Sequence, residues 1–274
     1  FTYTYQFLDN GKWTNWTGTV DTKGSTSFDA VRSCEWRLML TDSTNSSFKL
    51  YSNNIYVAAT MPALTLTAKD GTNSGTSFAI GSIIDVTANS ITVPSDLTGS
   101  GTTTITNIGN SNASVTNYVI GGNTAFKATY TYTYSSNAYY NFTIHSSILN
   151  ITATSTTLVI DATSGDSTAK VSNTYSFDFG SAVNVAINTT SWSSYKAPTG
   201  YSLSYQWYYD GGAVGAASST YAAYDISSLT SKNAGEYYLT ITCTNGKDQI
   251  FSIKSNTITI NQSHVTFNVG YDNS

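Results

Sequence analysis

The sequence predicts an all-β protein, and its composition is the first reason. Only 10% of the 274 residues are charged, whereas Ser and Thr together number 84 and Tyr numbers 21. Soluble domains ordinarily contain about 25% charged residues. Glutamate occurs only at Glu35 and Glu236. Strong helix formers are therefore scarce, while the β-branched and aromatic residues that favour strands are abundant.

Alternation of apolar and polar residues is the second reason. Segments of four to ten residues alternate with a period of two and end at Gly, Asn, Asp or Ser, which is typical of half-buried antiparallel strands joined by tight turns. Helical periodicity does not extend over any window of about 12 residues, so we expect only short helical turns. The predicted strands are residues 2–7, 63–68, 102–108, 125–134, 140–144, 184–188, 202–208, 236–242 and 257–260.

Internal repeats indicate tandem domains. The segment 63–71 (ALTLTAKDG) recurs in outline at residues 157–165 (TLVIDATSG) and, more loosely, at residues 264–272 (HVTFNVGYD). The starts of these segments lie about 94 and 107 residues apart, which is the length of one β-sandwich. Each recurrence is therefore predicted to be the first strand of a sandwich.

A second internal match identifies the N-terminal segment. Residues 204–212 (SYQWYYDGG) match residues 4–12 (TYQFLDNGK), and residues 234–241 (AGEYYLTI) match residues 33–40 (SCEWRLML). The N-terminal segment is thus predicted to be the later part of a domain whose first strands precede Phe1.

Together these matches predict the domain organisation. Residues 1–60 form the C-terminal part of one immunoglobulin-sized domain, and residues 61–156 form a complete β-sandwich. Residues 157–261 form a second complete sandwich, and residues 262–274 begin a further domain or a linker.

The third of these segments contains a recognisable motif. Residues 205–208 (YQWY) precede an Asp-Gly turn, and residues 233–239 (NAGEYYL) follow further along. This combination resembles the immunoglobulin-like domains of bacterial, archaeal and phage surface proteins, such as surface-layer (S-layer) or surface-filament proteins. The resemblance implies tandem Greek-key antiparallel sandwiches, with Trp207 as the core tryptophan, Tyr237 as the corner tyrosine and Leu239 in place of the second cysteine.

Charge, apolar runs and cysteines limit the partners and the redox chemistry. The 12 basic residues are scattered, so we expect no surface for nucleic-acid phosphates. Apolar runs stay far below the ~18 residues of a transmembrane helix, so no transmembrane segment is expected in this piece. Cys34 and Cys243 are predicted to lie in different domains and to stay unpaired.

The sequence lacks the residue groups that catalysis requires. His145 and His264 lie in different predicted units, and Glu35 and Glu236 occupy equivalent positions before matching strands. These positions favour structural roles over general acid–base or nucleophilic chemistry. We therefore expect no enzymatic activity, no catalytic residue and no cofactor.

Calcium is the metal that the sequence brings into question. Asp70, Asp161 and Asp166 follow the predicted first strands, near joints between domains. Calcium requires six to eight oxygen ligands, however, and Asp, Asn and Gly are ordinary turn residues. The sequence therefore favours no metal site at these three residues.

Sequons and a tyrosine-rich strand are the features that could indicate glycosylation or a ligand-binding surface. Chance predicts about seven Asn-x-Ser/Thr sequons at this composition, so their number does not indicate glycosylation. Tyr130, Tyr132 and Tyr134 share one strand face, which we expect to point into the core rather than to a ligand. The asparagines that could accept glycans are Asn15, Asn45, Asn112, Asn141, Asn150, Asn188 and Asn261.

Trp13 and Trp16 are the candidate contact aromatics. They lie beside the predicted Asp9-Asn10-Gly11 turn, where a turn does not easily bury two indoles. Two interpretations stay open: both rings pack on a neighbouring domain, or they form a contact site for a partner.

These features favour a structural role. We expect a non-catalytic segment of an extracellular, multi-domain surface protein of the S-layer or surface-filament kind, located on a cell or virion surface. Its expected partners are other copies of itself or neighbouring surface proteins, with surface glycans as a further class. One alternative is an adhesin or a phage fibre or capsid decoration module that binds glycans, and another is an accessory region of a secreted glycosidase.

Overall fold

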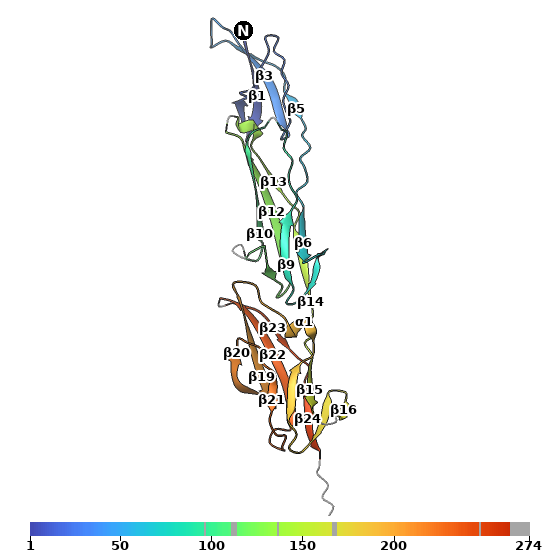
Figure 1. Cartoon of the computed structure of the whole chain (residues 1–274). Coiled ribbons are helices and arrows are strands. Elements are labelled where there is room, and N and C mark those ends of the chain that lie inside the picture. The colour runs from blue at the N-terminus through green and yellow to red at the C-terminus, as the bar shows by residue number, and fades with distance from the viewer. Residues whose placement is uncertain (96, 111–113, 136, 166–168, 247, 264–274) are drawn as a thin grey trace, which may run out of the picture. The chain divides into compact units, whose positions relative to one another are not determined.

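The protein is all-β. The computed structural model describes residues 1–95, 97–110, 114–135, 137–165, 169–246 and 248–263 (Figure 1). In these ranges the helical elements are one 3-10 turn, η1 (Ala138–Tyr140), and one short helix, α1 (Thr190–Ser193). The expectation that helices would be confined to short turns is confirmed.

The chain folds into two compact units. Unit 1 comprises Phe1–Thr76, Ile84–Tyr118 and Thr124–Ile151. Unit 2 comprises Ser77–Ile83, Val119–Asn123 and Thr152–Ser274. The domain boundaries expected after residues 60, 156 and 261 stay predictions.

The first sheet of unit 1 is a single antiparallel layer. Its order is β2-β1-β3-β4, and β5 also pairs with β3. Asn10 and Gly11 both have positive φ (49° and 77°), as a two-residue hairpin between β1 and β2 requires. The strands are β1 (Thr2–Asp9), β2 (Lys12–Asn15), β3 (Cys34–Thr41), β4 (Lys49–Tyr51) and β5 (Ile55–Val57).

The middle of the chain forms a two-layer sandwich. One sheet has the order β11-β9-β6-β7, and the other has the order β10-β12-β14-β8 with β13 on β12. Tyr130 and Tyr132 of β12 are buried in the core, which confirms their expected inward orientation. The strands are β6 (Leu66–Asp70), β7 (Asn73–Gly75), β8 (Ser77–Ala79), β9 (Ile83–Ala88), β10 (Ser100–Asn107), β11 (Tyr118–Val119), β12 (Thr124–Thr133), β13 (Phe142–His145) and β14 (Leu149–Thr154).

The rest of unit 2 is an immunoglobulin-like sandwich. A sheet of order β15-β18-β21 packs on a sheet of order β16-β17-β24-β22-β19-β20, in which β23 also pairs with β22. Strand β17 runs parallel to β24, whereas the other pairs in these two sheets are antiparallel. The strands are β15 (Ile160–Ser164), β16 (Ala169–Val171), β17 (Thr174–Asp178), β18 (Val183–Ile187), β19 (Tyr201–Tyr209), β20 (Gly212–Ser218), β21 (Tyr224–Ile226), β22 (Gly235–Asn245), β23 (Asp248–Lys254) and β24 (Ile258–Ser263).

Both cysteines are buried and unpaired, as predicted. Cys34 begins β3 in unit 1 and Cys243 lies in β22 of unit 2. Burial raises the pKa of Cys34, and the nearby Arg32 partly offsets this. Burial also raises the pKa of Cys243, to about 11. Both are therefore neutral, apolar core residues at physiological pH.

Candidate functional site

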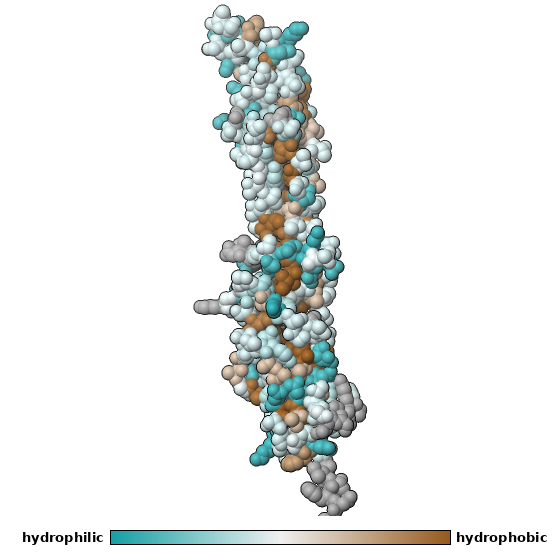
Figure 2. Space-filling view, viewed as in Figure 1, coloured by the Kyte–Doolittle hydropathy of each residue, from teal (hydrophilic) through white to brown (hydrophobic). Residues whose placement is uncertain are grey.

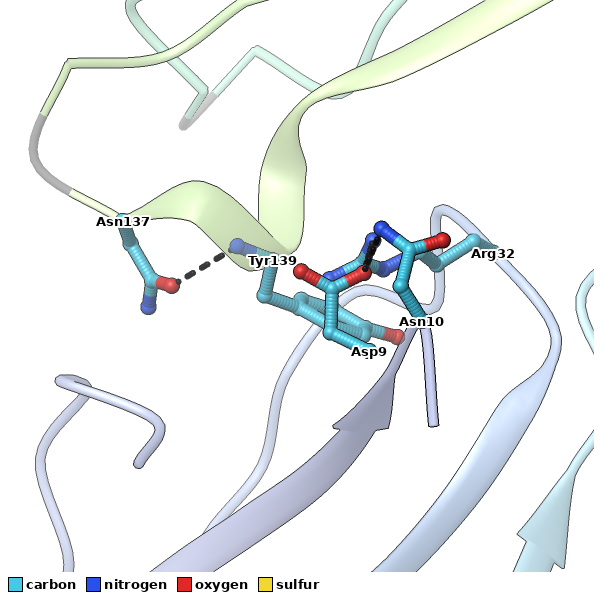
Figure 3. A network of polar contacts seen from close by, with 5 residues as sticks. All are labelled: Asp9, Asn10, Arg32, Asn137 and Tyr139. Carbon is cyan, nitrogen blue, oxygen red and sulfur yellow. Dashed lines mark hydrogen bonds and ion pairs between the residues drawn. The ribbon is translucent and has the colours of Figure 1, made fainter. Parts of the chain in front are cut away.

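One tyrosine from the middle of the chain, Tyr139, inserts into the core of the first sheet. Tyr139 lies in η1, where the Asn137 side chain accepts a hydrogen bond from its backbone N–H at 3.1 Å (Figure 3). Its ring is fully buried. The ring centroid lies 5.2 Å from that of Phe7 in β1 and 4.8 Å from that of Trp36 in β3. Tyr139 is thus the fully buried side chain that the middle of the chain contributes to the core of the first sheet, and Leu97, Tyr140 and Phe142 pack against the same cluster partly buried.

Arg32 supports this joint from the loop before β3. Its guanidinium lies over the rings of Phe7 (4.7 Å) and Tyr139 (5.3 Å). Its Nη1 donates to Asp9 Oδ1 at 3.1 Å, and Asn10 Nδ2 donates to the same oxygen at 3.4 Å (Figure 3). Cation–π contacts at partly desolvated sites contribute about 1 kcal/mol or more each, so Arg32 links the turn after β1 to the inserted ring.

Residues from the loop between β2 and β3 cover the rest of the apolar face of the first sheet. Trp16 and Phe28, from the segment between β2 and β3, pack on Trp36 with ring centroids at 6.2 and 4.3 Å. Val31 is also buried in this cluster. The segment therefore acts as a lid over the apolar face, although its described residues form no strand between β2 and β3.

The opposite face of the first sheet exposes a cation–aromatic ladder, which we define as Trp13, Arg37 and Tyr51. The Arg37 guanidinium lies 4.2 Å from the ring centroid of Trp13 and 4.2 Å from that of Tyr51. Arg37 Nε also donates to Gln6 Oε1 at 2.8 Å, and Gln6 Nε2 donates to Asn15 Oδ1 at 2.7 Å. These bonds hold the guanidinium beside both rings, of which Tyr51 is 50% exposed and Trp13 is partly exposed.

Unit 2 carries a similar row of side chains on the sheet that contains β19 and β22. Tyr208 of β19 and Tyr238 of β22 stack with centroids 4.6 Å apart and an interplanar angle of 8°. The Lys254 ammonium lies 3.7 Å from the Tyr238 centroid. Strands β1 and β3 of unit 1 match β19 and β22 in sequence, so both outer faces combine aromatic rings with a cation.

Exposed apolar side chains concentrate on β4 and β5. Ile55 is 53% exposed and Tyr56 is 69% exposed. Much of the face visible in Figure 2 has intermediate hydropathy, with separate hydrophobic patches among it. Large exposed apolar residues in this edge region are Phe48, Leu50, Tyr51, Ile55 and Tyr56.

The predicted core residues of unit 2 lie where the resemblance implied. Trp207 of β19 is buried and lies directly across from Leu239 of β22. Tyr237 is buried, and its hydroxyl donates to the backbone carbonyl of Asn233 at 2.6 Å. Trp207 Nε1 donates to the Ala222 carbonyl at 3.0 Å, so the indole polar atom is satisfied.

The two candidate contact aromatics separate. Trp16 is a core residue rather than a surface contact, because its side chain is buried in the cluster that contains Phe7 and Trp36. Trp13 is partly exposed and belongs to the ladder. The sequence did not distinguish them, since both flank the same turn.

The carboxylates considered for calcium do not converge in the described chain. Asp161 accepts hydrogen bonds from the Tyr175 hydroxyl and the Asn188 amide, which occupies its oxygens with neutral donors. Asp70 lies at the end of β6, and Asp166 lies outside the described residues. In the ranges that the structure describes, no three His, Cys, Asp or Glu side chains gather as metal ligands.

The sequon asparagines are accessible. Those that the structure describes are all exposed, and Asn112 lies outside the described residues. The exposed ones are Asn15, Asn45, Asn141, Asn150, Asn188 and Asn261.

Sequence reasoning missed Tyr139, Arg32 and Arg37. Tyr139 lies in a turn without periodicity, and its partners are more than 100 residues away, so no local pattern indicates its role. A signal did exist for the arginines: Arg32 and Arg37 are the chain's only two, and both border β3 or lie in it. Arginine is favoured over lysine where a planar cation stacks on aromatic rings.

The similarity of this chain to known proteins is low. No protein-family model matches the chain, and no curated protein sequence matches it. Among solved structures, three N-terminal domains of the bacteriophage RB49 highly immunogenic outer capsid protein are similar at 10% identity and a TM-score of 0.28, covering 96% of this chain and 89% of that chain. The FN1–FN3 domains of chicken CNTN1 are similar at 10% identity and 0.23, covering 95% and 91%.

A third solved structure is a Ca²⁺-stabilised adhesin that helps an Antarctic bacterium bind ice, at 11% identity and a TM-score of 0.23, covering 96% of this chain and 66% of that chain. As to membranes, the described residues include no helix long and apolar enough to cross a bilayer.

Proposed function

We propose that the chain is a non-catalytic structural segment of an extracellular, multi-domain surface protein, an S-layer or surface-filament component built from immunoglobulin-like repeats. The insertion of Tyr139 into the core of the first sheet is the observation that carries this proposal. A shared core resists bending and pulling, whereas a flexible linker would let neighbouring domains move independently.

The composition of the core supports the same role. Among the described residues, the polar side chains that are buried as a whole are neutral: Gln6, Asn107, Asn137, Ser181 and Ser255. The Arg32 guanidinium is a charged group with buried atoms, since its Nε and Nη2 are buried beside the Phe7 and Tyr139 rings. A core with few buried charges depends little on external salt and acid, which suits a protein that faces the surroundings of a cell or virion. Its proposed partners are other copies of itself or neighbouring surface proteins.

Imaging of the native protein tests this function. An antibody raised against this chain should label intact, unpermeabilised cells or particles, and electron microscopy of the isolated surface material should show an ordered layer or filament that the antibody decorates. Labelling that appears only after permeabilisation would contradict the proposal. Isolated flexible rods would favour adhesion instead.

A second candidate function is glycan adhesion, and the Trp13–Arg37–Tyr51 ladder favours it. Flat aromatic rings pack on the apolar faces of sugars, and a guanidinium donates several hydrogen bonds to hydroxyl or carboxylate groups. A glycan array probed with the wild-type chain and with Trp13→Ala tests this function. Binding that depends on Trp13 supports adhesion, and the absence of any bound glycan counts against it.

A further inference from the structure

Unit 2 contains a cleft of about 580 Å³. Its lining comes from three segments: residues 193–197 at the end of α1 and after it, the first half of β19, and residues 219–221 between β20 and β21. The first and third segments connect strands that belong to different sheets, so the cleft lies where the chain passes between the two sheets. Sites for small ligands typically have volumes of about 300–1,000 Å³, and this cleft is in that range.

Tyrosine is the most frequent aromatic residue in the cleft. The Tyr205 and Tyr221 rings have centroids 5.7 Å apart and an interplanar angle of 56°. Tyrosine combines a flat apolar ring with a polar hydroxyl, so the cleft offers both kinds of contact to one ligand. The tyrosines that line it are Tyr195, Tyr201, Tyr205 and Tyr221.

Hydrogen bonds hold two of these rings in place. The Tyr195 hydroxyl donates to the Gly81 carbonyl at 2.8 Å. The Tyr221 hydroxyl accepts a hydrogen bond from the backbone N–H of Ile187 at 2.7 Å. A ligand that binds between rings already fixed in position loses less conformational entropy on binding.

The Tyr205 hydroxyl is the polar group that is available to a ligand. The residue is only 8% exposed, and within the described residues its hydroxyl makes no hydrogen bond. This oxygen is not among the completely buried atoms without a partner, so it opens into the cleft. Burial raises the pKa of Tyr205, so the hydroxyl stays protonated and can both donate and accept.

The remaining lining indicates the class of ligand. Ser202, Ser219 and Thr220 add exposed hydroxyls, and Lys196 is the charged residue among the described residues of the lining. Hydroxyls donate and accept hydrogen bonds as sugar hydroxyls do, and aromatic rings pack on the apolar faces of sugars. Ligands rich in phosphate are instead bound by several cations or by arginine forks. The lining therefore favours a sugar.

We propose that this cleft binds a short oligosaccharide, with the Tyr201 and Tyr221 rings against sugar faces and the Tyr205 hydroxyl bonded to a sugar hydroxyl. The inference goes beyond the structural role, because it adds a ligand site in unit 2. It also does not involve the Trp13–Arg37–Tyr51 ladder of unit 1. Proline-rich peptides, which also bind aromatic-lined grooves, are the competing occupant that the experiment includes.

Titration of the isotopically labelled full chain, followed by NMR, tests the site. The probes are maltotriose, cellotriose, triacetylchitotriose, sialyllactose and a decaproline peptide. At least one saccharide should shift the amide signals of residues 193–205 and 219–221, with a Kd of about 1 mM or tighter. Tyr205→Phe should weaken this binding by about three- to tenfold, since one hydrogen bond is lost. Ser219→Trp, which places an indole in the cleft, should weaken it by about tenfold or more.

Matched variants separate binding from folding and from the ladder. Ser219 is exposed, so Ser219→Trp should unfold at the urea midpoint of the wild type. Tyr208→Phe changes the same group on the outer face of β19 and should leave the affinity unchanged, as should Trp13→Ala.

Four results would overturn the inference: no saccharide binds, decaproline binds in place of the saccharides, either cleft variant leaves the affinity unchanged, or the binding depends on Trp13. None of them would affect the imaging test of a surface structural role.

Discussion

Removing the Tyr139 ring should destabilise unit 1 as a whole. The side chain is fully buried, and its ring contacts Phe7, Phe28 and Trp36 with centroids within 5.7 Å. Replacing a large buried aromatic residue by alanine costs about 3–5 kcal/mol, because apolar area is lost and a cavity remains. Tyr139→Ala also removes one of the two rings under the Arg32 guanidinium, which places the expected loss in the upper half of that range.

Hydrogen exchange under native conditions measures this effect in each unit separately. In Tyr139→Ala, the free energy of opening of the β1 and β3 amides should fall by about 3–5 kcal/mol, while β19 and β22 should not change. Tyr139→Phe keeps the ring and is the matched control, with an expected loss below about 1 kcal/mol. An equally small loss in Tyr139→Ala would refute the argument that this ring joins the first sheet to the middle sandwich.

Three further predictions concern separate features. Trp207→Ala should destabilise unit 2 by about 3–5 kcal/mol without changing the exchange of unit 1 amides. Burial raises the pKa of Cys243 to about 11 in the folded protein. As pH rises, this thiol therefore loses its proton at a lower pH in the unfolded chain than in the folded one. The stability of unit 2 should therefore decline between about pH 9 and 11, at up to ~1.4 kcal/mol per pH unit for this group, and Cys243→Ala should reduce that decline in urea titrations. Arg37→Ala should cost unit 1 about 1–2 kcal/mol by the same urea assay, since it removes two cation–π contacts and a hydrogen bond, whereas Lys12→Ala should be neutral.

Local patterns predicted most of the strands and part of the core. Alternation predicted the inward orientation of Tyr130 and Tyr132, and the motif around Trp207 and Tyr237 predicted their burial. The Asn10-Gly11 pair predicted its hairpin through the positive φ that this turn requires. In each case, residues close in sequence determine the structure.

The candidate site depends on contacts that sequence patterns do not contain. Tyr139 meets Phe7 across more than 130 residues, and nothing in its neighbourhood distinguishes it from Tyr140. The segment between β2 and β3 illustrates a different limit. Its counterpart in unit 2 contains β21, which pairs with β18, but the described residues of the first sheet offer no equivalent of β18. Because a strand requires a partner, this segment becomes an irregular lid whose Trp16 and Phe28 fill the core.

A last prediction follows from how the charges are distributed. No charged side chain among the described residues is buried as a whole. Arg32 has two buried guanidinium nitrogens, but the side chains of the Arg32–Asp9 pair are 25% and 32% exposed. Pairs of this kind contribute about 0–1 kcal/mol and are screened by salt. Raising NaCl from about 0.05 to 0.5 M shortens the Debye length from roughly 14 to 4 Å, so unit 1 should lose less than about 1 kcal/mol in urea titrations. Asp9→Asn should remove the salt dependence of unit 1 stability. The stability of unit 2 should change little with salt. A larger loss in unit 2 would mean that ion pairs, rather than aromatic and neutral polar packing, stabilise its sandwich.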